Sequence, residues 1–242
     1  LAPRIEALGT LSRIPEALQQ AIHVTFSIER PDARAQAFAA LAPFLSPELL
    51  VEALHIVKSI ENNRLRALTL GKLAPYLPPD LTVAAFAVAR DLPAPENRAN
   101  ALTAIAPFLI STPRAQALSD ALAAALAVQD RFERVAALAD LAPYLTTDLR
   151  ERALEQALIA ARSIPDQIER SRALIFISPH LLPEQFANAL ADAYTISDPL
   201  ERIPVLGAML PYVPQEVQMP LAADILVLAR DEMTPLYQAG VL

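Results

Sequence analysis

The 242-residue sequence contains no cysteine, no tryptophan and only four glycines. Without cysteine the chain can form neither disulfides nor thiolate metal sites. The absence of cysteine says little about the cellular compartment, so a cytoplasmic location is the default expectation. The scarcity of glycine disfavours β-sandwiches, β-barrels and glycine-rich nucleotide-binding loops. No H-E-x-x-H, G-x-S-x-G or P-loop motif occurs. The sequence therefore contains no motif that indicates an enzyme.

Apolar side chains and proline are abundant. Hydrophobic residues make up 54% of the chain and charged residues 19%, so the chain can bury a large core. The 22 prolines are about twice the usual share, which fits many short helices with frequent stops. The net charge of -7 and the pI of about 5.0 argue against nucleic acid or an anionic membrane as a partner. No apolar run approaches the roughly 20 residues of a membrane span.

A five-residue pattern recurs along the chain at nearly constant spacing. It reads LAPFL at 41–45, LAPYL at 73–77, IAPFL at 105–109, LAPYL at 141–145, ISPHL at 177–181 and MLPYV at 209–213. Its prolines are Pro43, Pro75, Pro107, Pro143, Pro179 and Pro211, at intervals of 32, 32, 36, 36 and 32 residues. An arginine stands nine residues before each proline. Six matches at a fixed offset indicate an internal repeat.

Each repeat contains two stretches with helical periodicity. Positions -5, -2 and +2 relative to the proline are apolar, as at Phe38, Leu41 and Leu45, and these steps place them on one helix face. The second stretch follows the same rule at Leu50, Ala53, Leu54, Val57 and Ile60. We therefore predict an αα-hairpin with a first helix of about 12 residues and a second of about 14–17. The proline should lie in the last turn of the first helix and bend it.

One such hairpin cannot bury its apolar stripe alone, so consecutive copies must stack on one another. The predicted fold is all-α, an α-solenoid (superhelix) of stacked antiparallel αα-hairpins with a repeat period of 32–36 residues, forming a single repeat domain over residues 1–242. The hairpins are expected at about 4–30 (a degenerate copy), 32–61, 63–93, 96–129, 131–165, 167–197 and 199–230, with 231–242 as a tail.

The repeat resembles known helical repeat families. A first helix that opens with Asp-x-x-x-Arg and continues through small and apolar residues resembles the HEAT repeat family over nearly the whole chain. The pattern R-x-x-A-L-x-x-L-A-P-Y-L is also loosely similar to the repeat regions of bacterial NACHT/STAND-type signalling NTPases. These resemblances imply a solenoid that serves as the sensor or regulatory arm of a larger signalling protein.

The recurrent arginine lies on the core-facing stripe of its helix, because position -9 precedes position -5 by about one helical turn. A partly buried arginine there would bond to carbonyl or acidic groups at the end of the preceding hairpin. We interpret the six residues as a structural ladder, with a row of ligand-binding guanidinium groups as the alternative. The ladder consists of Arg34, Arg66, Arg98, Arg134, Arg170 and Arg202.

Positions -7 and -3 vary between copies and should point away from the core. They include Gln36, Lys72, Asn100, Asp140, Arg172 and Phe176, which we expect to form a partner surface if the chain has one, with Phe176 as its apolar anchor. The alternative is ordinary solvent-exposed surface.

The expected function is a protein-interaction or scaffold repeat region that binds a protein or peptide, without a cofactor or metal. The histidines His23, His55 and His180 fall in separate copies, which disfavours a metal site. The apolar last helix, 221–228, has no complete hairpin after it, so we expect a piece of a longer chain. The alternative function is an enzyme or small-molecule binder built on a helical-repeat shell, with its pocket near Pro204, Gly207 and Pro220.

Overall fold

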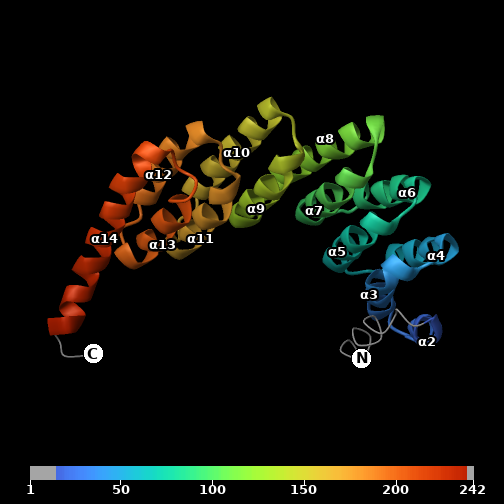
Figure 1. Cartoon of the computed structure of the whole chain (residues 1–242). Helices are drawn as coiled ribbons and strands as arrows, with labels where there is room; N and C mark the ends of the chain where they lie inside the picture. The colour runs from blue at the N-terminus through green and yellow to red at the C-terminus, as the bar shows by residue number, and fades with distance from the viewer. Residues whose placement is uncertain (1–14, 239–242) are drawn as a thin grey trace. The chain divides into compact units, whose positions relative to one another are not determined.

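The computed structural model describes residues 15–238, which form 13 α-helices, α2 to α14, and no β-strand (Figure 1). The predicted all-α fold of stacked αα-hairpins is confirmed, because first and second helices alternate along the chain and neighbouring hairpins pack together within each of two units. Within this range, no helix is both long and apolar enough to cross a lipid bilayer. The chain divides into two compact units, residues 1–125 and 126–242.

Unit 1 begins, within the described residues, with α2 (Pro15–Phe26), the second helix of the degenerate copy expected at 4–30. Residues 4–14 of that copy lie outside the described residues. The first helices are α3 (Pro31–Leu41), α5 (Asn63–Leu73) and α7 (Pro95–Ile105), and α5 packs between the other two. The second helices are α4 (Pro47–Lys58), α6 (Pro79–Arg90) and α8 (Ser111–Ala127), whose last two residues belong to unit 2.

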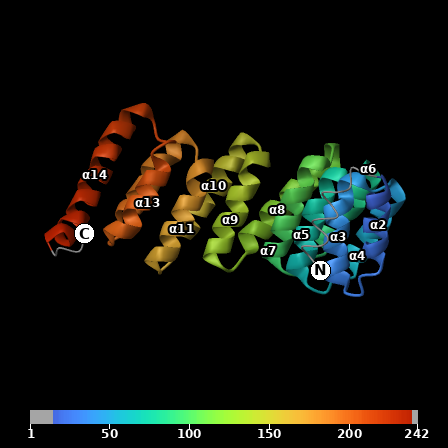
Figure 2. The ribbon, with the colours of Figure 1, turned by 60° about the horizontal axis from the view of Figure 1, so that its bottom comes forward.

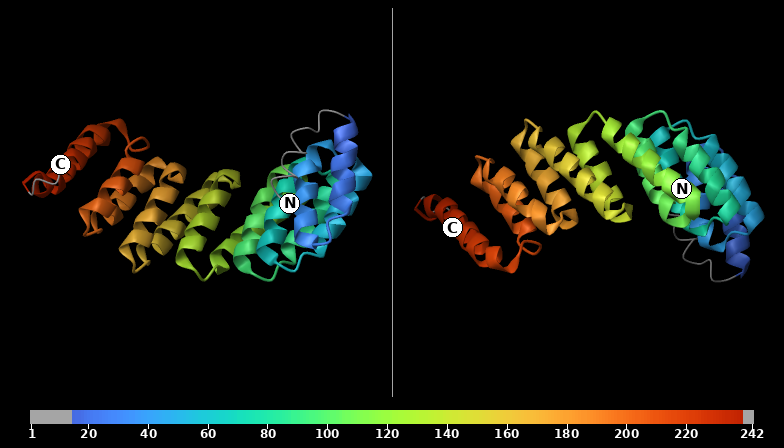
Figure 3. Two further views of the ribbon diagram at one scale, coloured as in Figure 1. Left: turned by 90° about the horizontal axis from the view of Figure 1, so that it is seen from below. Right: turned by 90° about the horizontal axis from the view of Figure 1, so that it is seen from above.

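Unit 2 has the same alternation. Its first helices are α9 (Arg131–Leu141), α11 (Gln167–Ile177) and α13 (Pro199–Met209), and its second helices are α10 (Thr147–Arg162), α12 (Phe186–Tyr194) and α14 (Gln215–Gln238). The helices α9, α11 and α13 lie side by side in that order, as Figure 2 and the yellow-to-red part of Figure 3 show. Helix α14 continues to Gln238, beyond the expected start of a tail at residue 231, and residues 239–242 lie outside the described range.

Helix lengths follow the spacing of the repeat. All six first helices between α3 and α13 have 11 residues. The second helices α4 and α6 have 12 residues, whereas α8 and α10, from the 36-residue copies, have 17 and 16. The insertion therefore adds about one helical turn, which keeps the buried face in register. Helix α12 has only nine residues because the 3₁₀ turn η6 (Pro183–Gln185) precedes it.

The repeat proline lies just beyond the α-helix and not in its last turn as expected. In five copies it is the middle residue of a 3₁₀ turn: η1 (Ala42–Phe44), η2 (Ala74–Tyr76), η3 (Ala106–Phe108), η4 (Ala142–Tyr144) and η5 (Ser178–His180). Proline lacks the N–H that an α-helical bond would need, so the chain tightens into 3₁₀ geometry there. The amide of the second residue after the proline closes the turn, as from Leu45 to the carbonyl of Ala42 at 3.3 Å.

The core consists of aliphatic and small residues from the predicted columns. Phe38 and Leu41 in unit 1, and Leu138 and Leu141 in unit 2, have no exposed surface. Small residues let neighbouring helices approach closely: a Cβ atom added at Gly71 on α5 would lie 3.0 Å from the Cβ of Ala104 on α7. Any larger residue at position 71 would therefore push these two helices apart.

Candidate protein-interaction face

Four of the six repeated arginines donate to a backbone carbonyl six residues earlier. The bonds are Arg66 Nε to Ile60 at 2.9 Å, Arg98 Nη1 to Leu92 at 2.8 Å, Arg134 Nε to Val128 at 2.7 Å and Arg170 Nη1 to Ile164 at 2.7 Å. In Arg34 and Arg202 the Nε atom is buried and has no hydrogen-bond partner. Each acceptor residue follows the end of a second helix, where carbonyl groups have no intrahelical donor.

The acids beside these arginines have another role. Asp130 and Asp166 each accept a hydrogen bond at 2.8 Å from the amide of the residue three positions later, and Asp198 accepts one at 2.9 Å from the amide of Leu200. These three carboxylates therefore cap α9, α11 and α13 at their N-termini. We continue to interpret the arginines as structural, because their bonds to carbonyls leave fewer donors for a ligand.

The residues of the predicted partner surface are all solvent-exposed. Gln36, Lys72 and Asn100 lie on α3, α5 and α7 of unit 1. Asp140 lies on α9, and Arg172 and Phe176 lie on α11, all in unit 2. The structure thus distributes the predicted residues over the first helices of both units.

In unit 2 these positions belong to a larger exposed face. Positions -11, -7, -3 and +1 relative to the repeat proline are four residues apart, so they form one line along each first helix and the turn that follows. We call this set the first-helix face of unit 2. It consists of Phe132, Ala136, Asp140 and Tyr144; Ile168, Arg172, Phe176 and His180; and Leu200, Pro204, Ala208 and Tyr212.

The first-helix face of unit 2 is mainly apolar, although solvent reaches it. The exposed fractions are 64% for Leu200, 47% for Ile168 and Tyr212, 39% for Tyr144 and 37% for Phe176. Only Asp140 and Arg172 carry a formal charge when histidine is neutral. Because α11 packs against both α9 and α13, the three lines of side chains lie next to one another.

Aromatic rings connect α9 with α11 on this face. The ring centroids of Phe132 and Phe176 are 6.4 Å apart with a tilted geometry. Phe176 in turn stacks on His180, with centroids 6.2 Å apart and an angle of 27° between the planes. Such contacts hold the rings in place and preform an aromatic surface.

Asp140 and His180 are electrostatically coupled beside these rings. Partial burial raises the pKa of Asp140, and the nearby His180 opposes that rise. Partial burial also lowers the pKa of His180; Asp140 opposes this shift, whereas the charge of Arg150 reinforces it. Arg150 on α10 donates from Nη2 to the carbonyl of His180 at 3.3 Å, which holds the turn η5 against the second helix.

The equivalent positions of unit 1 are more highly charged but also carry exposed apolar side chains. They hold Asp32, Arg64, Lys72 and Glu96 on α3, α5 and α7, together with the exposed Phe44, Leu68, Tyr76 and Phe108. The two units also differ in total charge. Unit 1 has 11 acidic and 11 basic residues, whereas unit 2 has 16 acidic and nine basic residues, so the net charge of -7 belongs to unit 2.

Only part of the first-helix face of unit 2 was predicted from the sequence. The prediction covered positions -7 and -3, whereas Phe132, Ile168 and Leu200 stand at position -11. The step of four residues from -7 back to -11 would have found them, since this step keeps a side chain on the same helix face. Their exposure, however, depends on how α9, α11 and α13 pack.

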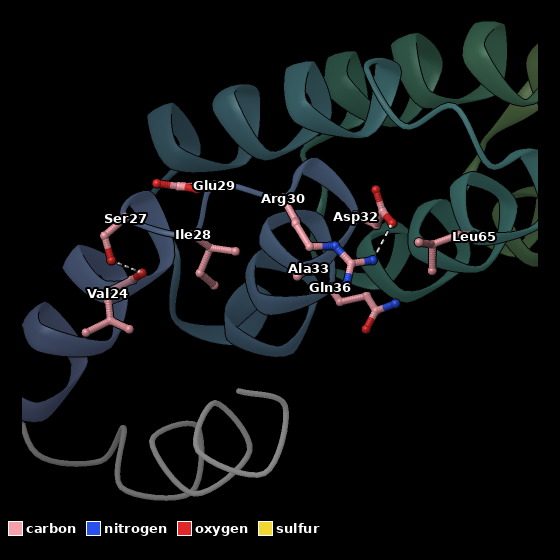
Figure 4. A pocket seen from close by; sticks show the side chains of 9 residues that line it. All are labelled: Val24, Ser27, Ile28, Glu29, Arg30, Asp32, Ala33, Gln36 and Leu65. Carbon is pink, nitrogen blue, oxygen red and sulfur yellow. Dashed lines mark hydrogen bonds and ion pairs between the residues drawn. The ribbon is translucent and has the colours of Figure 1, made fainter.

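A pocket of about 710 Å³ lies in unit 1 between α2, α3 and α5 (Figure 4). Its lining combines apolar residues such as Val24, Ile28 and Leu65 with the ion pair of Arg30 and Asp32, whose atoms are 3.2 Å apart. The Arg30 side chain is largely exposed to solvent. This pocket lies away from Pro204, Gly207 and Pro220 of unit 2, where the small-molecule alternative placed its site.

No family model matches the chain, and neither the curated proteins nor the solved structures searched contain a match. The support for the fold is therefore the internal sequence repeat and the helix pairs of the structure. It is a repetitive all-helical protein whose helix pairs recur about every 32 residues.

Proposed function

We propose that the chain is a protein-interaction repeat region and that it binds its partner through the first-helix face of unit 2. The observation that carries this proposal is the row of exposed apolar and aromatic side chains across α9, α11 and α13. Soluble proteins rarely expose contiguous large apolar surface unless it binds something. Aromatic residues also contribute much of the energy at protein interfaces, which makes Phe176 and Tyr212 the expected anchors.

The repeat architecture supports the same role. Stacked hairpins present one row of helices as an extended and rigid surface, and such surfaces suit large partners better than small ligands. The resemblance to HEAT repeats and to the repeat regions of NACHT/STAND-type signalling NTPases adds a cellular context. In that context the chain is the sensor or regulatory arm of a larger bacterial signalling protein. An NTPase module encoded in the same gene would support this role.

A small-molecule or catalytic function is less well supported. Such sites usually bury most of the ligand and bring a few polar groups together in an enclosed cavity. In the 710 Å³ pocket of unit 1, the charged pair of Arg30 and Asp32 faces solvent. Its charged groups are therefore open to water and do not converge in an enclosed cavity.

Site-specific photo-crosslinking in source-cell extract tests the proposed function. A photoreactive phenylalanine analogue replaces Phe176 on the face, and in a matched control it replaces Ile159, which is exposed on α10. We expect a discrete crosslinked protein from position 176, competed by the unmodified chain, and none from position 159. The same crosslinks from both positions, or none from position 176, would reject the face as the binding site.

A further inference from the structure

We infer that the segment that docks on the first-helix face of unit 2 is an amphipathic helix with lysine or arginine beside its apolar residues. This inference rests on the proposed function and specifies the partner's chemistry. It follows from three features of unit 2: the charge along one edge of the face, the carboxylate within the face, and the spacing of its apolar side chains.

The edge of the face at the N-termini of α9, α11 and α13 carries six acidic residues against four arginines, Arg131, Arg134, Arg170 and Arg202, and is therefore net negative. Positions -13 and -10 hold Asp130 and Glu133, Asp166 and Glu169, and Asp198 and Glu201. In unit 1 the same positions hold Arg30 and Ala33, Asn62 and Leu65, and Ala94 and Asn97. Together with the net charge of unit 2, this edge favours a cationic partner, because complementary charge speeds association and disfavours acidic competitors.

Within the face, Asp140 offers a carboxylate next to aromatic rings. It interacts electrostatically with His180, and His180 stacks on Phe176. The aliphatic part of a lysine or arginine can pack on such rings while its charged end reaches a neighbouring carboxylate. The Asp140 carboxylate therefore offers a cationic side chain an ion pair beside the aromatic rings.

The spacing of the apolar residues suits a helix. Side chains four residues apart form ridges along α9, α11 and α13, and helices pack by fitting such ridges into each other's grooves. An amphipathic helix presents apolar residues every three or four positions and lies with that side on an apolar surface. Its basic residues would then flank the contact, next to the acidic edge.

Three fluorescent peptides of about 16 residues test the inference with the full chain. The first has leucine and phenylalanine at helical spacing with lysine elsewhere. The second replaces every lysine with glutamate, and the third is a scrambled form of the first without helical periodicity. By fluorescence anisotropy at low salt, we expect the first to bind at least about tenfold more tightly than the others, and added salt to weaken it.

Variants of the chain locate the binding. Phe176→Ala should weaken the lysine peptide about tenfold because it removes an aromatic anchor. Asp140→Asn should weaken it about three- to fivefold because it removes one charge and preserves shape. Glu155→Gln, on the exposed side of α10, is the matched control and should leave binding unchanged.

The outcomes separate the inference from the proposed function. Equal binding of lysine and glutamate peptides, with both weakened by Phe176→Ala, would overturn the cationic partner and leave the interaction face intact. If the scrambled peptide binds as tightly as the first peptide, charge alone accounts for the binding, and the inference of an amphipathic helix is wrong. If Phe176→Ala leaves the binding of all three peptides unchanged, both the inference and the proposed face are rejected.

Discussion

The Nη1 atom of Arg170 donates a hydrogen bond to the carbonyl oxygen of Ile164 at 2.7 Å. Ile164 follows the last turn of α10, and Arg170 lies in the first half of α11, so the bond joins the end of one hairpin to the start of the next. The same six-residue step recurs at Arg66, Arg98 and Arg134. A charged donor therefore satisfies a carbonyl that the end of the helix leaves without a partner.

Replacing Arg170 should destabilise unit 2. Arg170→Ala removes the charged donor to Ile164, and we expect the free energy of unfolding to fall by about 1.5–3 kcal/mol. Urea unfolding followed by circular dichroism at 222 nm measures this change. Arg172→Ala, two residues later on the exposed side of α11, is the control and should change stability by less than about 0.5 kcal/mol. Equal effects of the two substitutions would contradict the structural role.

A second link joins α10 to α12 across 30 residues. Arg162 Nε lies 2.7 Å from Asp192 Oδ1, and its Nη2 lies 3.0 Å from Oδ2, so the pair is bidentate. The Asp192 side chain is 7% exposed and that of Arg162 is 59% exposed. The hydrogen bond and charge of Asp192 raise the pKa of Arg162 above its ordinary value.

A double-mutant cycle should detect this link. Because Asp192 is buried, Asp192→Ala should lower the free energy of unfolding by about 1–3 kcal/mol. Arg162 is largely in water, so the coupling free energy between the two side chains should be only about 1 kcal/mol. Strictly additive effects of Asp192→Ala and Arg162→Ala in urea unfolding would show that the pair contributes nothing.

The hydroxyl of Tyr194 on α12 donates to Asp224 on α14 at 2.7 Å. Burial, followed by the hydrogen bond and charge of Asp224, raises the pKa of Tyr194 to about 12. The folded chain therefore keeps a proton that the unfolded chain loses near pH 10. The resulting stabilisation is complete below pH 10 and is lost as the pH rises through about 12.

Alkaline titration at 295 nm tests this assignment. One tyrosine of the native chain should ionise near pH 12, and Tyr194→Phe should remove that step. Asp224→Ala should move the step toward pH 10, because the acceptor and its negative charge are gone. A step that stays in place in Asp224→Ala would show that another group raises the pKa.

His180 should titrate below its ordinary range. Burial lowers its pKa, so the folded chain disfavours the charged imidazole, and the associated stability is present above pH 6.5 and lost as the pH falls through the folded pKa. Asp140→Asn should lower this pKa further, because the negative charge that opposes the shift is removed. Proton NMR of the imidazole Hε1 measures it, with Asp231→Asn on α14 as the control. An unchanged or higher pKa in Asp140→Asn would refute the coupling.

The helices could be predicted from the sequence because their causes are local. The 3.6-residue periodicity, the capping residues such as Asp130 and Asp166, and the repeat proline act over a few positions, so the recurring pattern indicates the helix pairs directly. The repeat proline nevertheless lies in a 3₁₀ turn directly after the first helix, and not in the last turn of that helix as predicted. The missing N–H of proline shows only where α-helical hydrogen bonding must stop.

The first-helix face of unit 2 was harder to predict from the sequence. Phe176 and Asp140 were selected because their positions vary between copies, but nothing local connects Phe132 with Phe176 or Asp140 with His180. Each pair joins one hairpin of unit 2 to the next, and His180 lies in the turn η5 that follows α11. Only the packing of α11 beside α9 brings them together, and only that packing shows which apolar residues stay exposed.

The sequence by itself determined the all-α repeat, the hairpin period and the arginine column, since each depends on spacing along one chain. The tertiary structure decided that four of the arginines bond to backbone carbonyls, that Arg162 meets Asp192, and which apolar side chains of α9, α11 and α13 stay exposed. The physical reason is that helical periodicity orients a side chain relative to its own axis, whereas its partners depend on the distance and offset between packed helices.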